Sequence, residues 1–287
     1  MKTIAATLHD GAKIDVEISG SGPALLLPVD PISLTGEEAE AKQKWGVDPA
    51  LGRHFIDGLN DTFTVIAFDY EGFRMQHPAA ETLTPDNIVK DFLAIADAAG
   101  AKTFAYYGYS WLALCALQLG IRTDRLWALI MGAYPPIDGP YKEMWAVTSA
   151  TYEMALHPEK QDWPTTQKSD DEYDWDSAEI SLSGEQTKQF FTLYDALQNF
   201  DDRAVQDKIA CPRLCFVGSN DKQEYSEKWG GVTVDMATPL VENANELRRC
   251  GWDVRVLDGL DHISAMQPVN VLPVIKPWLA DKANHTR

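Results

Sequence analysis

Residues 104–119 read Phe104-Ala-Tyr-Tyr-Gly-Tyr-Ser-Trp-Leu-Ala-Leu-Cys-Ala-Leu-Gln-Leu119 and place one serine between two apolar runs. The run before Gly108 is typical of a buried strand. The run after Ser110 is apolar on nearly every helical face, which is typical of a buried helix. A serine at such a strand-to-helix turn has a strained backbone and a raised hydroxyl, and the first N–H groups of the helix stabilise an anion beside it. The stretch therefore predicts Ser110 as a nucleophile.

A serine hydroxyl needs a general base, and the base needs an orienting carboxylate. Of the six histidines, His262 comes just after the expected strand 253–257. Asp221 comes just after the expected strand 213–218. The order Ser110, Asp221, His262, each at the carboxyl end of a strand, is one of the known chain orders of a catalytic triad. We therefore predict these three residues as the catalytic set.

Other residues compete for a role at this site. Asp138 is the main alternative acid, because it comes after the strand that follows the serine. Asp258 and Asp261, in the same segment as His262, are weaker candidates. Tyr109, inside the serine turn, and Trp145, in an aromatic-rich segment further on, are predicted to contact the substrate.

Strands and helices alternate along most of the chain, and turn residues separate them. Strands are expected at 3–8, 13–18, 24–27, 63–69, 103–107, 126–131, 213–218 and 253–257. Helices are expected at 49–59, 85–99, 111–121, 237–250 and 271–282. This alternation predicts an α/β fold in which helices cover both faces of a mostly parallel sheet.

The segment 136–207 interrupts the alternation. It is rich in aromatic residues and has a strongly acidic centre at 170–176. Because it lies between two sheet strands, we expect it to form a helical cap or lid over the strand ends. The predicted organisation is a core made of residues 1–135 and 208–287, with the cap at 136–207.

The chain has 287 residues, 43 of them acidic and 25 basic, and a net charge of −18. This charge argues against nucleic acid and anionic membranes as partners, because both recruit Lys and Arg. No apolar run reaches the length of a membrane span, and the N-terminus lacks the pattern of a signal peptide. The four cysteines form no C-x-x-C pair, so we expect reduced thiols in a cytoplasmic protein.

Over nearly its whole length the chain resembles proteins of the α/β-hydrolase fold. Gly108 and Ser110 match the family's G-x-S-x-G motif, with Leu112 in place of the last glycine. Residues 68–74, Phe-Asp-Tyr-Glu-Gly-Phe-Arg, stand where the family often has D-x-R-G-x-G, with Glu71 where Arg is common. The resemblance implies an eight-stranded sheet with an inserted cap, a serine nucleophile, an acyl-enzyme and no cofactor.

In this family the loop after the third strand supplies one N–H of the oxyanion hole. Where the family commonly has His-Gly, this loop reads Leu27-Pro-Val-Asp-Pro-Ile32. Its two prolines lack an N–H, which leaves Val29, Asp30 and Ile32 as donors. The predicted oxyanion hole is the N–H of Trp111 with that of Asp30 or Val29. We expect the Asp30 carboxylate to bind N–H groups of its own loop, away from the developing negative charge.

These features predict a cofactor-independent serine hydrolase that cleaves an ester, a lactone or a related acyl bond of a small molecule. No metal site is expected, because the acidic run at 170–176 lacks the glycine and the final glutamate of a calcium loop. The alternatives are a ligand-binding relative with little turnover, and a C–C hydrolase or aminopeptidase with the same triad. Gly-Tyr-Ser-Trp at 108–111 also resembles the elbow of proline iminopeptidases.

Overall fold

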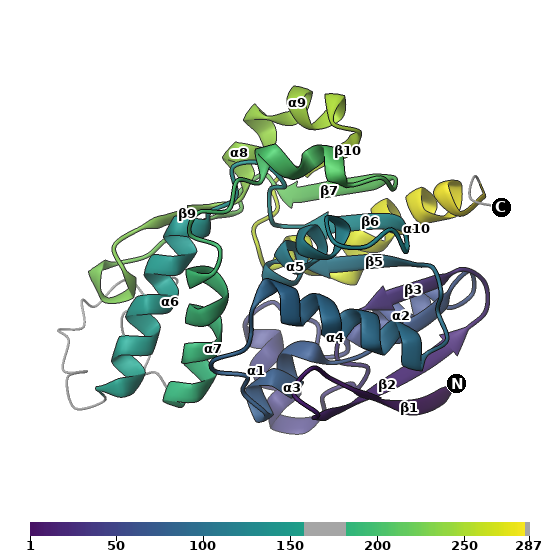
Figure 1. The fold of residues 1–287 in the computed structure, drawn as a ribbon, viewed down its shortest axis with the longest axis horizontal. Helices are drawn as coiled ribbons and strands as arrows, with labels where there is room; N and C mark the ends of the chain where they lie inside the picture. Colours follow the sequence, from purple (N-terminus) through teal and green to yellow (C-terminus); the bar gives the residue numbers. More distant parts are fainter. Residues whose placement is uncertain (158–181, 285–287) are drawn as a thin grey trace.

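One twisted sheet of eight strands runs through the protein (Figure 1). The computed structural model describes residues 1–157 and 182–284. The strand order is β1-β2-β4-β3-β5-β6-β7-β10. Only the β1–β2 and β2–β4 pairs are antiparallel. The strands are β1 (Lys2–Thr7), β2 (Lys13–Gly20), β3 (Ala24–Leu27), β4 (Thr64–Ala67), β5 (Phe104–Tyr109), β6 (Leu126–Gly132), β7 (Arg213–Gly218) and β10 (Trp252–Leu257).

All eight expected strands are present, and their ends differ from the expected ends by at most two residues. The helices are α1 (Gly36–Lys44), α2 (Leu51–Leu59), α3 (Tyr70–Gln76), α4 (Pro85–Ala98), α5 (Trp111–Gly120), α6 (Tyr141–Leu156), α7 (Gly184–Asp195), α8 (Ala237–Glu242), α9 (Ala244–Arg249) and α10 (Pro268–Asn284). The expected helix 237–250 is divided at Asn243 into α8 and α9. A small hairpin of β8 (Lys222–Glu224) and β9 (Thr233–Asp235) follows β7.

The sequence patterns did not predict α1 and α3, for different reasons. Helix α1 has no buried residue, so it carries no apolar periodicity to reveal it. Helix α3 is capped at its N-terminus by Asp69, whose carboxylate accepts the Gly72 N–H at 2.9 Å. The apolar pattern places Asp69 at the end of the expected strand 63–69, whereas its side chain caps the next helix.

Helices cover both faces of the sheet. Along β3, Leu26 belongs to the core beneath α4 and α5, while Leu25 and Leu27 belong to the core beneath α2 and α10. This alternation follows from the two-residue period of a strand. Every residue of β6 and of β7 is buried, as expected for central parallel strands covered on both sides.

The segment between β6 and β7 contributes α6 and α7, which pack against each other at one end of the sheet (Figure 1, left). Helix α7 is docked on the core through hydrogen bonds to backbone carbonyls. Gln186 Nε2 donates to Met75 O at 2.7 Å, and Thr192 Oγ1 donates to Ala80 O at 2.6 Å. The acidic run at 170–176 lies outside the described residues.

All four cysteines are free thiols. Cys115 and Cys215 are buried, whereas Cys211 and Cys250 are half-buried. Within the described residues, every helix is too short or too polar to cross a bilayer.

Candidate active site

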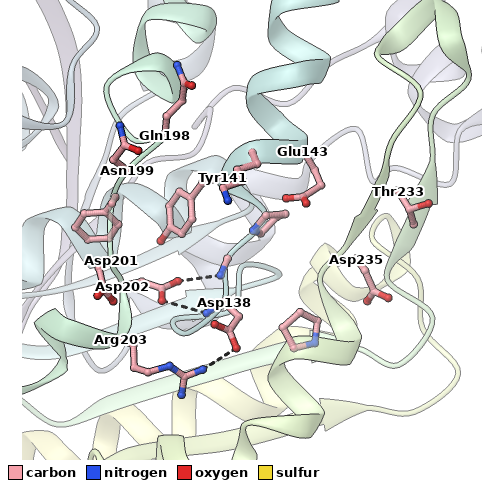
Figure 2. Close-up of a pocket in the computed structure, with 15 residues that line it drawn as sticks. Asp138, Tyr141, Glu143, Gln198, Asn199, Asp201, Asp202, Arg203, Thr233 and Asp235 are labelled. Atoms are coloured by element: carbon pink, nitrogen blue, oxygen red, sulfur yellow. Dashed lines mark hydrogen bonds and ion pairs between the residues drawn. The ribbon is translucent and has the colours of Figure 1, made fainter.

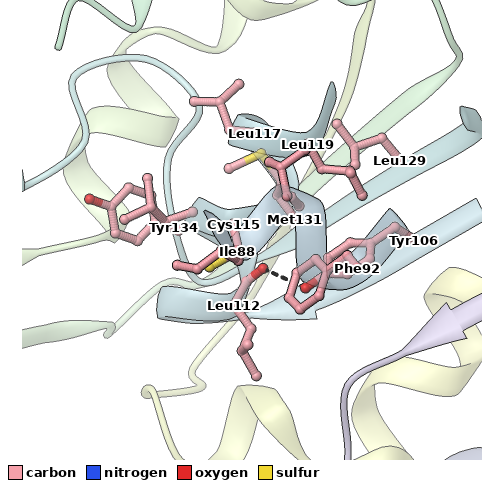
Figure 3. Packing of buried hydrophobic residues seen from close by; sticks show 14 of the residues in the cluster. Ile88, Phe92, Tyr106, Leu112, Cys115, Leu117, Leu119, Leu129, Met131 and Tyr134 are labelled. Carbon is pink, nitrogen blue, oxygen red and sulfur yellow. Dashed lines mark hydrogen bonds between the residues drawn. The ribbon is translucent and has the colours of Figure 1, made fainter. Parts of the chain in front are cut away.

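Ser110 stands between β5 and α5 with the backbone angles φ 57° and ψ −130°. Such a left-handed conformation is strained for a residue other than glycine. The turn is tight, because a Cβ atom on Gly108 would lie 2.2 Å from the Leu112 carbonyl oxygen. That carbonyl accepts a hydrogen bond from the Tyr106 hydroxyl at 3.0 Å (Figure 3). Leu112, the departure from the family motif, is buried in the first turn of α5.

The loops that carry Asp221 and His262 are joined through their backbones. The Asn220 N–H donates to Leu260 O at 2.9 Å, and the Ser219 N–H donates to Leu257 O at 3.0 Å. Gly218 permits this approach, since a Cβ there would lie 2.3 Å from Leu260 O. Because β7 and β10 are parallel neighbours, their carboxyl ends bring the two loops to the same edge of the sheet.

The three predicted catalytic side chains form one hydrogen-bonded chain. Ser110 Oγ lies 3.2 Å from His262 Nε2. His262 Nδ1 lies 2.9 Å and 3.0 Å from the two carboxylate oxygens of Asp221. The Asp221 side chain is 5% exposed and that of His262 is 36% exposed. A buried carboxylate on one imidazole nitrogen and a hydroxyl on the other is the arrangement that general-base activation of a serine requires.

Tyr109 lies beside this chain and contacts its base. Its hydroxyl donates to the backbone carbonyl of His262 at 2.7 Å, and its ring centroid lies 5.2 Å from that of the imidazole. Burial, with a contribution from the Asp221 carboxylate, raises the pKa of Tyr109, which keeps the hydroxyl protonated. Tyr109, predicted to contact substrate, therefore lines the same pocket as Ser110 while its hydroxyl holds the backbone of His262.

Asp138, the alternative acid, lies in a separate hollow of about 620 Å³ at the start of α6 (Figure 2). Its carboxylate pairs with Arg203 at 2.7 Å and accepts a hydrogen bond from Asn243 at 2.9 Å. The neighbouring Asp202 is buried and accepts the backbone N–H groups of residues 138 and 139. Asp261, a weaker candidate acid, is hydrogen-bonded to Ser264.

The hydrogen bonds of the loop after β3 differ between its two predicted oxyanion donors, Val29 and Asp30. The Val29 N–H already donates to Leu27 O at 2.9 Å, which favours Asp30 over Val29 as the donor from this loop. The N–H groups of Asp30 and Trp111 donate to no other described residue, and both residues line the same pocket as Ser110. As expected, the Asp30 carboxylate turns to its own loop, where Oδ1 accepts the Ile32 N–H at 2.8 Å.

Two pockets meet at Ser110 and Trp111. The inner pocket, of about 180 Å³, lies under α6 and α7 and is lined by Met144, Thr148, Thr151, Phe190, Tyr194 and Met236, among others. The outer pocket, of about 550 Å³, is lined by the loop after β3, by the start of α2, by α3 and by His262.

Trp145, predicted to contact substrate, is not among the described residues that line either pocket. Its indole N–H donates to Asp195 at 3.2 Å. Met144 and Thr148 of the same helix line the inner pocket instead. The signal that could have identified this face is the spacing of Met144, Thr148 and Thr151, which places the three on one side of a helix.

The Trp111 side chain stands at the junction of the two pockets. Its indole N–H donates to the Glu71 carboxylate at 2.8 Å, and its ring meets Phe190 edge-on at 5.3 Å between centroids. Burial, together with the carboxylates of Asp30 and Glu71, raises the pKa of Asp69 in the outer pocket. In residues 1–157 and 182–284, no group of three or more His, Cys, Asp or Glu side chains is arranged to hold a metal ion.

Comparison of the sequence with protein-family models and with curated proteins gives no match. Solved structures match over the whole chain. An esterase from Exiguobacterium antarcticum is 15% identical with a TM-score of 0.58, covering 99% of this chain and 100% of that one. A thermophilic esterase from Thermogutta terrifontis is 16% identical with a TM-score of 0.57 and the same coverage. An epoxide hydrolase from hot-environment metagenomes is 16% identical with a TM-score of 0.56, covering 98% of each chain. The chain has the α/β-hydrolase fold, as its sequence predicted.

Proposed function

We propose that this protein is a serine hydrolase that cleaves an ester or lactone of a small molecule through an acyl-enzyme. The observation that carries the proposal is the hydrogen-bonded chain of Ser110, His262 and Asp221 at the edge of two pockets. The esterases among the similar structures are consistent with this chemistry. A serine nucleophile is not the aspartate on which epoxide hydrolases of this fold depend, so we favour acyl transfer.

In the proposed reaction, His262 Nε2 takes the proton of Ser110 as Oγ attacks the substrate carbonyl. The N–H groups of Trp111 and Asp30 stabilise the oxyanion, and Asp221 stabilises the imidazolium. The imidazolium then protonates the leaving alcohol, and the acyl group stays on Ser110. His262 next takes a proton from water, which attacks the acyl-enzyme, and the carboxylic acid leaves with Ser110 restored. Helices α6 and α7, the described part of the proposed cap 136–207, form one wall of the inner pocket.

A fluorophosphonate probe and intact-mass spectrometry test the proposal directly. We expect one adduct per chain, at Ser110, and transient acylation by an activated ester. Ser110→Ala should lose both the adduct and about 10⁴-fold or more of the ester hydrolysis. A folded protein that binds a ligand tightly but neither labels nor hydrolyses any ester would instead be a binding protein.

The same Asp-to-Asn substitution, made at two positions, tests which carboxylate orients His262. Asp221→Asn should lower kcat by about 10³- to 10⁴-fold, because the amide no longer stabilises the imidazolium. Asp138→Asn is the matched control and should stay within a few-fold of wild type, since Asp138 contacts Arg203 and not His262. A large loss in the control with none in Asp221→Asn would refute the assignment.

A further inference from the structure

The positions of the two pockets around Ser110 determine how an acyl substrate lies in the site. Both pockets reach Ser110 and Trp111, but His262 lines the outer pocket alone. Asp30, which carries the second oxyanion N–H, also lines the outer pocket alone. The inner pocket therefore has contact with the nucleophile and with neither the base nor the loop after β3.

The direction of the leaving group follows from the chemistry of the triad. The same imidazole nitrogen that accepts the serine proton must later give a proton to the leaving oxygen. That oxygen must consequently depart on the side of His262, towards the outer pocket. With the oxyanion placed between two backbone N–H groups, the remaining substituent of the carbonyl carbon, its acyl chain, points into the inner pocket.

The inner pocket presents an apolar wall despite its threonines. Thr148 Oγ1 donates to Met144 O at 2.8 Å, and Thr151 Oγ1 donates to Val147 O at 2.7 Å. Thr187 likewise donates to the Ser183 carbonyl at 3.1 Å. Because each hydroxyl is bonded to its own helix, these side chains are left to face the pocket with their methyl groups, beside Met236 and Phe190.

The volume of the inner pocket limits the acyl group. A closed apolar cavity of about 150 Å³ holds a benzene molecule in another protein. By that measure a pocket of about 180 Å³ accommodates roughly seven carbon atoms. The outer pocket, of about 550 Å³, has room for a much larger group.

We propose that the preferred substrates join a medium-chain or aryl acyl group, held in the inner pocket, to a larger alcohol held in the outer pocket. This inference rests on the proposed hydrolase function. It assigns acyl-chain selectivity to Met144 and Thr151 of α6, which line only the inner pocket.

Two ester series test the inference, with kcat/KM measured for each member. In one series the acid varies from acetate to dodecanoate on p-nitrophenol, and in the other the alcohol varies on acetate. Wild type should prefer hexanoate or octanoate and lose about tenfold or more at dodecanoate, since methylenes that do not fit cost that much. Met144→Ala should raise the dodecanoate-to-butanoate ratio by about tenfold, and Thr151→Phe should lower the octanoate-to-acetate ratio by a similar factor.

Trp145→Phe is the matched control, on the same helix but outside both pockets, and its acid profile should equal that of wild type. The alcohol profile should be the same in all four proteins. If Ser110 is labelled and acetate is hydrolysed, but neither variant shifts the acid profile or both shift the alcohol profile, the inference is overturned and the proposed function stands. If Ser110 is not labelled and no ester is cleaved, both are overturned.

Discussion

The hydroxyl of Tyr109 contacts the backbone of the proposed base, so its effect on catalysis should pass through His262. We expect Tyr109→Phe to lower kcat by about tenfold while KM changes little, because one hydrogen bond that orients the imidazole is lost and the ring remains. Steady-state kinetics with a p-nitrophenyl ester measures both constants.

Tyr107→Phe, the same change on the same strand and in the lining of the same pocket, is the control. It should leave kcat near wild type, because the hydrogen bond to the His262 carbonyl comes from Tyr109. A rise in KM without a change in kcat would show that Tyr109 binds substrate, as its sequence position suggested, and does not position the base.

Residues next to one another in the sequence differ in how far their roles could be predicted. The sequence was enough to predict the roles of Ser110, Asp221 and His262. Each comes at the end of an apolar run, and parallel strands bring such ends to one edge of the sheet. The sequence could not show that Met144, and not its neighbour Trp145, lines the inner pocket. One step along a helix turns a side chain by about 100°, so the helix orientation has to be known first. The hydrogen bond of the Val29 N–H to Leu27 depends on loop conformation, about which residue types say little.

At the scale of elements, Gln189 joins helix α7 to α3 and to the segment that follows α3. The side chain is fully buried; its Nε2 donates to Arg74 O at 3.1 Å, and its Oε1 accepts the Ala79 N–H at 3.2 Å. Gln189→Leu would leave two backbone groups unpaired. We therefore expect the free energy of unfolding to fall by about 1–3 kcal/mol, measured by urea denaturation.

The control is Lys188→Ala on the same helix, which should leave the free energy of unfolding nearly unchanged. Lys188 pairs at the surface with Glu81, and solvent screening leaves such exposed pairs with little effect on stability. Equal stability of Gln189→Leu and wild type would mean that α7 is held by other contacts.

Asp202, which is hydrogen-bonded to the backbone just before helix α6, should make the stability of the protein depend on pH. Burial raises the pKa of Asp202 to about 6, from an ordinary value of 3.8. Between these values the folded protein holds a proton that the unfolded chain releases, so the free energy of unfolding falls as pH rises. The fall is at most about 3 kcal/mol and is complete above the folded pKa.

Asp202→Asn removes this titration, so relative to wild type the variant should be more stable above about pH 7 than near pH 4. Denaturant unfolding at both pH values measures the difference. Asp201→Asn, at the adjacent exposed aspartate, should show no such change. A stability difference between Asp202→Asn and wild type that is the same at both pH values would contradict the role of Asp202.

At the scale of the whole molecule, the net charge of −18 acts together with the carboxylates of Asp30, Asp69 and Glu71 in the outer pocket. A leaving group that carries a negative charge should be repelled both on approach and in the pocket. We expect kcat/KM for a carboxyphenyl acetate to be well below that for phenyl acetate at low salt. It should rise about threefold or more in roughly 0.5 M NaCl, because salt screens the repulsion. An equal salt response of the neutral ester would argue against this explanation.

The docking of α7 through backbone carbonyls has a consequence for how the protein could change over generations. The backbone carbonyls of Met75 and Ala80 are present whatever side chains stand at these positions. Substitutions there therefore keep the hydrogen bonds that attach α7. Helix α6 packs against this fixed support and carries Met144 and Thr151 on its pocket face. New acyl preferences can therefore evolve by substitutions on α6 alone, and a mutant library confined to that face is the shortest route to altered specificity.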